Sequence, residues 1–233
     1  DLEVGTTPTR TAIGIKEDGT VVFYTSASTT DGAPTSLNQV AVRLVELGCV
    51  QAMCLDGGGS TTLAATYPGG TTYSIINNTA YGTLRNCSNY IVLATSLPND
   101  GIADSLWIYP YDTMLLAGAT LELTTKAADQ ARRAATVPSN LVYEVTNGVG
   151  SVDSNGVFTA AVEGTGEVIV SSEGLKSGSA TVRVIQNPSE IKVKREDGNT
   201  VTNLSLQAGE SVDLTATAYY NHIDMVSQDS CYT

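Results

Sequence analysis

The sequence predicts an α+β domain with a mixed sheet, followed by an all-β sandwich and the start of a second one. Three observations predict this order. A strand–helix–strand pattern fills the first hundred residues, short alternating segments with turn residues about every 8–12 positions follow from near residue 98, and the pattern restarts after Asn187-Pro188. We therefore expect domains at 1–98, 99–187 and 188–233.

Composition narrows the function classes. The 233 residues include 12 Lys+Arg against 24 Asp+Glu, a net charge of −12, which disfavours binding to nucleic acid. No apolar run of about 18 residues occurs, so no membrane span is predicted, and no signal-peptide pattern opens the chain. The single histidine, His222, excludes Ser-His-Asp or Cys-His catalysis in the first two thirds and a His-rich zinc site. We expect no metal and no cofactor.

The first two elements are a β-hairpin and a helix. Residues 9–27 alternate around Asp18-Gly19, which is a strong turn signal. Ser36 with Gln39 forms a capping box, and Gly48 supplies the C-terminal stop. One face of this helix is expected to be apolar and carries Leu37, Val40, Ala41, Leu44 and Val45.

The rest of the first domain reads as strands. The apolar run 50–55 predicts a buried strand that leads into the loop 56–60. Strands at about 61–67 and 71–77, joined by Pro68-Gly69-Gly70, and a last strand at 88–95 complete the expected sheet.

From residue 98 onward we expect no helix. The expected strands are Leu121–Thr124, Val142–Val145, Glu167–Ser171, Ala180–Ile185, Ile191–Val193 and Val212–Leu214. Their spacing is typical of an antiparallel sandwich of roughly immunoglobulin size. The 46 residues from 188 to 233 are too few to close a second core, so we expect the chain to be cut at its C-terminus.

Four cysteines, at positions 49, 54, 87 and 231, lack the spacing of metal ligands. Cys49 and Cys54 flank apolar residues and are predicted to be buried free thiols. A disulfide among the first three cysteines is the alternative if the protein is exported.

The loop Asp56-Gly57-Gly58-Gly59-Ser60 is the candidate functional site. Three glycines let a substrate approach the backbone, and consecutive free amides would form an anion-binding nest. Asp56 follows a predicted buried strand, a place where α/β folds put functional groups. A Walker A phosphate loop is disfavoured because no lysine and no helix follow. From these residues alone, a plain tight turn remains the alternative.

The surrounding pattern resembles the phosphodiester glycosidase family, to which the enzyme that uncovers mannose 6-phosphate belongs. The resemblance rests on four motifs in order: Thr9-Arg10-Thr11-Ala12-Ile13-Gly14, Leu55-Asp56-Gly57-Gly58-Gly59-Ser60-Thr61, Asn77, and Arg85-Asn86-Cys87-Ser88-Asn89. It covers about residues 5–96 and implies the C-terminal half of the catalytic domain. The upstream half, absent from this sequence, is an expected partner.

The resemblance implies hydrolysis of a sugar-1-phosphodiester, such as one carrying N-acetylglucosamine. A phosphate monoester leaves as a stable anion, so one carboxylate with good anion recognition suffices. Asp56 is the expected carboxylate, as base, nucleophile or positioning group, and Arg10 and Arg85 are expected to hold the phosphate. The expected substrate-binding residues are Thr11, Gly57, Gly58, Gly59, Ser60, Thr61, Asn77 and Asn89.

Several alternatives stay open at this point. A second carboxylate would come from Glu17, Asp18, Asp31 or the upstream half, although Asp18 fits better as a turn residue. The two arginines also suit a surface ion pair and a loop cap. Both asparagines also suit hydrogen bonds to backbone groups at strand ends.

The stretches 152–160 and 164–170 resemble bacterial Ig-like group 2 modules, with Tyr143 in place of a core tryptophan. Such modules are spacers or adhesive stalks, so the resemblance implies a secreted or cell-surface bacterial protein acting on a phosphate-linked glycan. The alternative is a non-catalytic carbohydrate-binding or adhesive surface protein on an Ig-like stalk.

Overall fold

The computed structural model describes residues 9–26, 35–77, 84–86, 90–196, 198–221 and 223–232. The chain divides into two compact units, residues 1–67 with 72–95 (unit 1) and residues 68–71 with 96–233 (unit 2). The described residues are mostly β, in several sheets, and contain no helix-rich domain. The elements of unit 1 are β1 (Arg10–Lys16), β2 (Val21–Ser26), α1 (Leu37–Glu46), β3 (Cys49–Cys54), a 3-10 turn at Gly58–Ser60, β4 (Ala64–Ala65) and β5 (Ser74–Ile75).

Unit 1 begins with the predicted hairpin, which is confirmed. In the turn between β1 and β2, Gly19 has a φ of +83° and its amide donates to Lys16 O over 3.0 Å. Asp18 Oδ1 accepts from the amide of Thr20 over 2.9 Å, and this bond holds the pKa of Asp18 below its usual value. β3 pairs with the other edge of β1, giving the order β2-β1-β3. Both neighbours of β1 run antiparallel to it, so the predicted mixed sheet is wrong for these strands.

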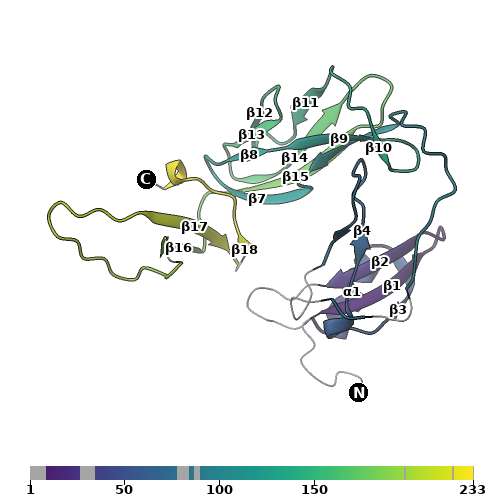
Figure 1. The fold of residues 1–233 in the computed structure, drawn as a ribbon, viewed down its shortest axis with the longest axis horizontal. Helices are drawn as coiled ribbons and strands as arrows, with labels where there is room; N and C mark the ends of the chain where they lie inside the picture. Colours follow the sequence, from purple (N-terminus) through teal and green to yellow (C-terminus); the bar gives the residue numbers. More distant parts are fainter. Residues whose placement is uncertain are drawn as a thin grey trace. The chain divides into compact units, whose positions relative to one another are not determined.

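Helix α1 covers one face of this sheet (Figure 1). The capping box is confirmed: the Ser36 hydroxyl accepts from the Gln39 amide over 3.1 Å, and the Gln39 side chain accepts from the Ser36 amide over 2.8 Å. Gly14 lies on the sheet face that α1 covers: a Cβ placed there would lie 3.5 Å from Leu44 Cδ2 of the helix and 2.6 Å from Cys49 Sγ of β3. Absence of a side chain at residue 14 therefore makes room for the buried Cys49 side chain.

The core of unit 1 is smaller than the sequence predicts. Of the five residues expected on the buried face of α1, only Val40 and Leu44 are buried, and Val45 is 70% exposed. The run 50–55 was predicted to be a buried strand, but in β3 only Cys49 is buried, whereas Val50 and Met53 are 62% and 61% exposed. No layer of the described residues covers β3 on both faces, and this explains the error.

The second half of unit 1 contains less strand than expected. β4 and β5 are two-residue strands that pair antiparallel within the predicted ranges 61–67 and 71–77. The predicted strand at 88–95 is wrong for its described part, because residues 90–95 belong to no strand. Tyr90, Val92 and Leu93 are each at least 75% exposed, so this apolar segment lies in water.

Unit 2 contains strands throughout and, among its described residues, one short helical turn. The strands are β6 (Ser105–Tyr109), β7 (Asp112–Leu116), β8 (Thr120–Glu122), β9 (Thr124–Ala128), β10 (Ala134–Ala135), β11 (Val142–Val145), β12 (Gly150–Val152), β13 (Val157–Ala160), β14 (Gly164–Ser171), β15 (Gly178–Ile185), β16 (Glu190–Arg195), β17 (Leu214–Tyr220) and β18 (Ile223–Asp224). A 3-10 turn spans Asp229–Cys231.

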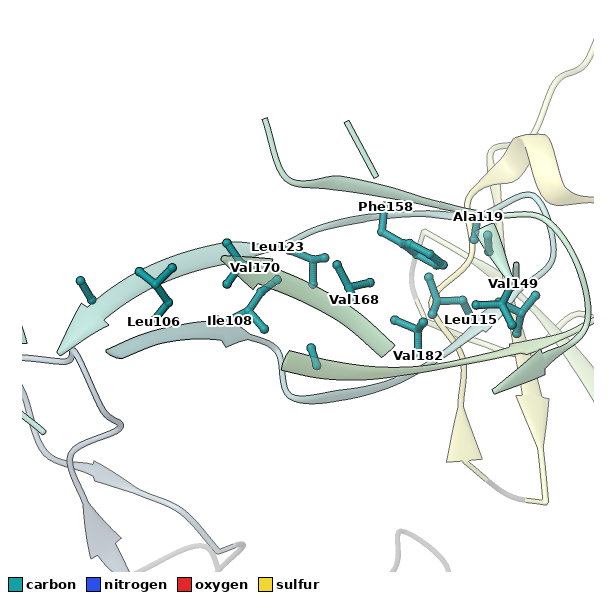
Figure 2. Close-up of a cluster of buried hydrophobic side chains, with 14 residues drawn as sticks. Leu106, Ile108, Leu115, Ala119, Leu123, Val149, Phe158, Val168, Val170 and Val182 are labelled. Carbon is teal, nitrogen blue, oxygen red and sulfur yellow. The ribbon is translucent and has the colours of Figure 1, made fainter. Parts of the chain in front are cut away.

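Three sheets of unit 2 enclose one core. Their strand orders are β11-β14-β15-β7, β10-β9-β6 and β12-β13-β8. The core cluster holds 14 buried residues, among them Phe158, Leu115 and Val182, none of which is exposed at all (Figure 2). Phe158 extends from β13 toward side chains of the opposing strands. The stretch 121–124, predicted as one strand, is divided at Leu123, so β8 and β9 belong to different sheets.

The turn at 153–156 is determined by hydrogen bonds and a backbone angle of its own residues. Asp153 Oδ1 accepts from the amide of Val157 over 2.8 Å and from that of Asn155 over 2.9 Å. The bond from Val157 is the main cause that holds the pKa of Asp153 below its usual value. Gly156 completes the turn at a φ of +82°, which favours glycine.

The C-terminal strands form a fourth sheet, β16-β17-β18. The segment after β18 adds to the free edge of β7, with Val226 N donating to Met114 O over 2.9 Å and Leu116 N to Val226 O over 3.0 Å. The side-chain amide of Gln228 binds both backbone groups of Thr120, at the start of β8. The β7 edge is therefore protected from pairing with other chains. That residues 188–233 form a truncated second module stays a prediction.

Candidate functional site

The triple-glycine loop leaves the sheet at the end of β3. The amide of Leu55 donates to Thr11 O over 2.8 Å, so pairing with β1 extends one residue beyond β3. The chain then turns at Gly58–Ser60, where the amides of Ser60 and Thr61 donate back to the carbonyls of Gly57 and Gly58. This brings residues 56–61 beside the start of β1.

Thr9 anchors the loop to the sheet. Its hydroxyl donates to Gly58 O over 2.7 Å, and its carbonyl accepts from the Gly58 amide over 2.9 Å. The side chain of Thr9 is fully buried. Thr9 is not among the residues predicted for the site, although its place directly before Arg10 in the first motif is a signal for it.

Gly57 and Gly58 are required for different reasons. Gly58 has a φ of +61°, in the left-handed region that favours glycine. Gly57 has an extended φ of −120°, but a Cβ there would lie 2.9 Å from Thr9 O and 3.9 Å from Arg10 Cδ. Gly57 therefore permits close packing of the loop on β1.

Replacing Gly57 with alanine is expected to lower the free energy of unfolding by about 1–3 kcal/mol, the usual cost of overpacking. Thr9 cannot move away easily, because two hydrogen bonds hold it to Gly58. Urea denaturation of G57A measures the effect, with the exposed Ser74→Ala on β5 as control. Equal stability of G57A and the parent chain would contradict this packing argument.

Both predicted arginines lie at this loop. The Arg10 side chain passes beside Gly57, and its Nε donates to Thr35 O over 2.9 Å, which orients the guanidinium group. Arg85 Nη1 donates to Ser60 Oγ over 3.3 Å. Residues 75 positions apart in the sequence therefore reach the two ends of one short loop.

Asp56 stands exposed at the start of the loop. Its Oδ1 accepts from the amide of Gly57 over 3.0 Å. The predicted row of free amides is not present, because the amides of Gly57, Gly58 and Ser60 donate to oxygens of the protein. Of the four amides from 57 to 60, that of Gly59 alone has no acceptor within the described part of the chain. The candidate anion-binding groups at this loop are therefore the two arginine side chains rather than a row of backbone amides.

Of the remaining predicted site residues, Thr11, Thr61 and Asn77 form hydrogen bonds within the protein next to the loop, and one lies outside the described residues. The Thr11 hydroxyl donates to Thr61 Oγ1 over 3.1 Å, and Thr61 is fully buried. Asn77 is 8% exposed and binds backbone groups on both sides of its amide. Asn89 is outside the described residues.

Two of the candidates for a second carboxylate are far from the loop. Glu17 and Asp18 follow β1, whereas Arg10 begins it, and seven residues of strand span roughly 20 Å. Asp31 lies outside the described residues.

The cysteines differ in part from their prediction. Cys49 is a buried free thiol as predicted, but Cys54 is exposed, and Cys231 is also free. Cys87 and His222 fall outside the described residues. Nowhere in the described ranges do three or more His, Cys, Asp or Glu side chains gather in a way that would hold a metal ion. The helices in those ranges are all too short or too polar to span a bilayer.

The comparison with known proteins gives a match at the level of a protein family. A search of curated proteins finds no match to the chain. A match to a family model extends from residue 3 to residue 94, so it includes the loop, both arginines and Asn77. That model describes the phosphodiester glycosidases, and residues 3–94 of this chain are similar to that family.

Proposed function

We propose that this protein hydrolyses a sugar-1-phosphodiester in a phosphate-linked glycan, with Asp56, Arg10 and Arg85 at its active site. The observation that carries the proposal is the convergence of both arginines and the carboxylate on the five-residue loop 56–60. This set combines anion recognition with one carboxylate, and the family match supports the same chemistry.

The reaction places modest demands on the protein. Water adds its oxygen to the anomeric carbon, the bond from that carbon to the phosphate oxygen breaks, and the phosphate monoester leaves as an anion. Two guanidinium groups can stabilise that anion, so the leaving oxygen does not need a proton from a general acid. Asp56 then acts on the attacking side, as a base, as a nucleophile or by positioning the sugar.

The proposal is tested by incubating the chain with an N-acetylglucosamine-1-phosphodiester and with an N-acetylglucosaminide that lacks phosphate. We expect release of sugar and phosphate monoester from the first substrate only, as measured by mass spectrometry. Equal hydrolysis of both substrates, or release of a free alcohol with the sugar phosphate intact, would contradict the proposed recognition and bond cleavage.

The upstream half of the catalytic domain is the partner that we propose for unit 1. The sheet face opposite α1 carries Ile15, Val21 and Met53, which are 43%, 44% and 61% exposed. Together with the exposed apolar segment 90–93, this is the surface that a further layer of the domain would cover.

A non-catalytic carbohydrate-binding or adhesive role is the second candidate. It is favoured by the position of Glu17 and Asp18 at the far end of β1. From there, neither residue can act as a second carboxylate beside Asp56. Binding of the phosphodiester without turnover would favour this role. In both cases we propose that residues 99–187 form an Ig-like spacer and that the protein is secreted or displayed on a bacterial surface.

A further inference from the structure

We infer that Asn77 is a positioning residue, which fixes the triple-glycine loop for its reaction, and that it does not bind sugar hydroxyls. This inference rests on the proposed function for the meaning of the site. Its structural part, the role of Asn77 in holding the loop, rests only on the contacts of Asn77.

The side chain of Asn77 takes the place of a peptide group. The backbone pairing of β4 with β5 extends to a bond from Ile76 N to Leu63 O, 2.8 Å long. One residue further on, the Asn77 side chain continues it: Nδ2 donates to Thr61 O over 2.9 Å, and Oδ1 accepts from Leu63 N over 2.5 Å. The side-chain amide of Asn77 therefore connects the end of β5 to the segment 61–63, which directly follows the loop.

Burial agrees with this role. Asn77 is 8% exposed, and both functional groups of its amide already have backbone partners. A substrate hydroxyl that displaced either bond would leave a buried peptide group unpaired, which costs about 1–3 kcal/mol.

Asn77 and Thr9 together hold the loop at two points. In the middle of the loop, Thr9 holds Gly58 through two hydrogen bonds. At the C-terminal end, Asn77 holds the carbonyl of Thr61, whose buried hydroxyl accepts from Thr11. Ser60, which contacts Arg85, lies between these two anchors. Movement at Thr61 would therefore shift the Ser60–Arg85 contact.

Two variants separate the contributions of the amide. Asn77→Asp keeps the acceptor for Leu63 N, loses the donor to Thr61 O and places a buried charge beside that carbonyl. Asn77→Leu keeps the number and branching of the side-chain heavy atoms and loses both bonds. Asn38→Asp, on the exposed surface of α1, is the matched control. All variants are made in the full chain.

Amide hydrogen exchange tests the structural part without any need for activity. We expect exchange at Leu63 to rise at least tenfold in Asn77→Leu, which loses the acceptor for its amide. Exchange at Thr61, whose carbonyl loses its donor in both Asn77 variants, is expected to rise at least tenfold in each and to stay unchanged in Asn38→Asp. Unchanged exchange in both Asn77 variants would overturn the inference, whether or not the protein turns over a phosphodiester.

A deoxy-sugar series distinguishes positioning from substrate binding. If Asn77 positions the loop, each variant lowers kcat by the same factor, about tenfold, for the parent sugar and for analogues that lack one hydroxyl. If it binds a hydroxyl, the effect disappears for the analogue that lacks that hydroxyl, and the inference is wrong. Absence of turnover in the parent chain would instead count against the proposed function, and hydrogen exchange would still decide the role of Asn77.

Discussion

Replacing Asp56 with asparagine is expected to lower kcat/KM for a sugar-1-phosphodiester at least a hundredfold, the usual scale for loss of a catalytic acid or base. The side chain is exposed, and it accepts a local hydrogen bond from the amide of the next residue. Asparagine can accept the same bond, so we expect the melting temperature to stay within about 1 °C of the parent value. Steady-state kinetics and thermal unfolding of D56N measure the two effects.

Asp18→Asn is the matched control for this experiment. Asp18 is also an exposed aspartate that accepts a local backbone hydrogen bond, but it lies at the opposite end of β1 from the loop. A loss of activity in D18N comparable to that in D56N would show that the effect is not specific to the loop. Full activity of D56N would remove Asp56 from the mechanism and favour the non-catalytic role.

The features that the sequence predicted well in unit 1 are those set by neighbouring residues. The turn at Asp18-Gly19 and the capping box of Ser36 with Gln39 each depend on residues at most three positions apart, and both are present. Burial was predicted poorly, because it depends on what covers a segment. Val50 and Val45 are apolar side chains of the kind found in protein cores, but they are exposed because no described layer packs on them.

The assignment of Asp56, Arg10 and Arg85 to an active site stays a prediction. The structure shows that the Arg10 side chain lies beside Gly57 and that Arg85 donates to Ser60. The use of the loop amides could not be read from the sequence, because it depends on Thr9, about 50 residues away. The same holds for Asn77, whose partners are set by the register of β4 with β5.

In unit 2 the strands were predicted mainly from the turn residues between them. Asp153 and Gly156 fix their turn through local bonds and a positive φ, so the flanking strands follow from the sequence. The division of 121–124 between two sheets could not be predicted, because both halves have the same alternating pattern. Leu123 marks the division: its amide donates to Gly156 O over 2.9 Å, which extends the pairing of β8 with β13 by one residue before β9 begins.

Replacing Phe158 with alanine is expected to have the largest effect on stability, a loss of about 3–5 kcal/mol in the free energy of unfolding. Phe158 is the largest of the fully buried side chains (Figure 2). Its ring packs over Gly150 on the adjacent strand β12, where a Cβ would lie 2.7 Å from the ring Cζ and would also contact Thr159 O. The neighbouring backbone is therefore shaped around the ring and cannot collapse to fill the cavity that alanine would leave. Urea denaturation of F158A measures the loss, and the 60% exposed Val162→Ala, expected to cost less than about 0.5 kcal/mol, is the control. A loss below about 1 kcal/mol in F158A would mean that the sheets of unit 2 do not depend on this ring for their packing.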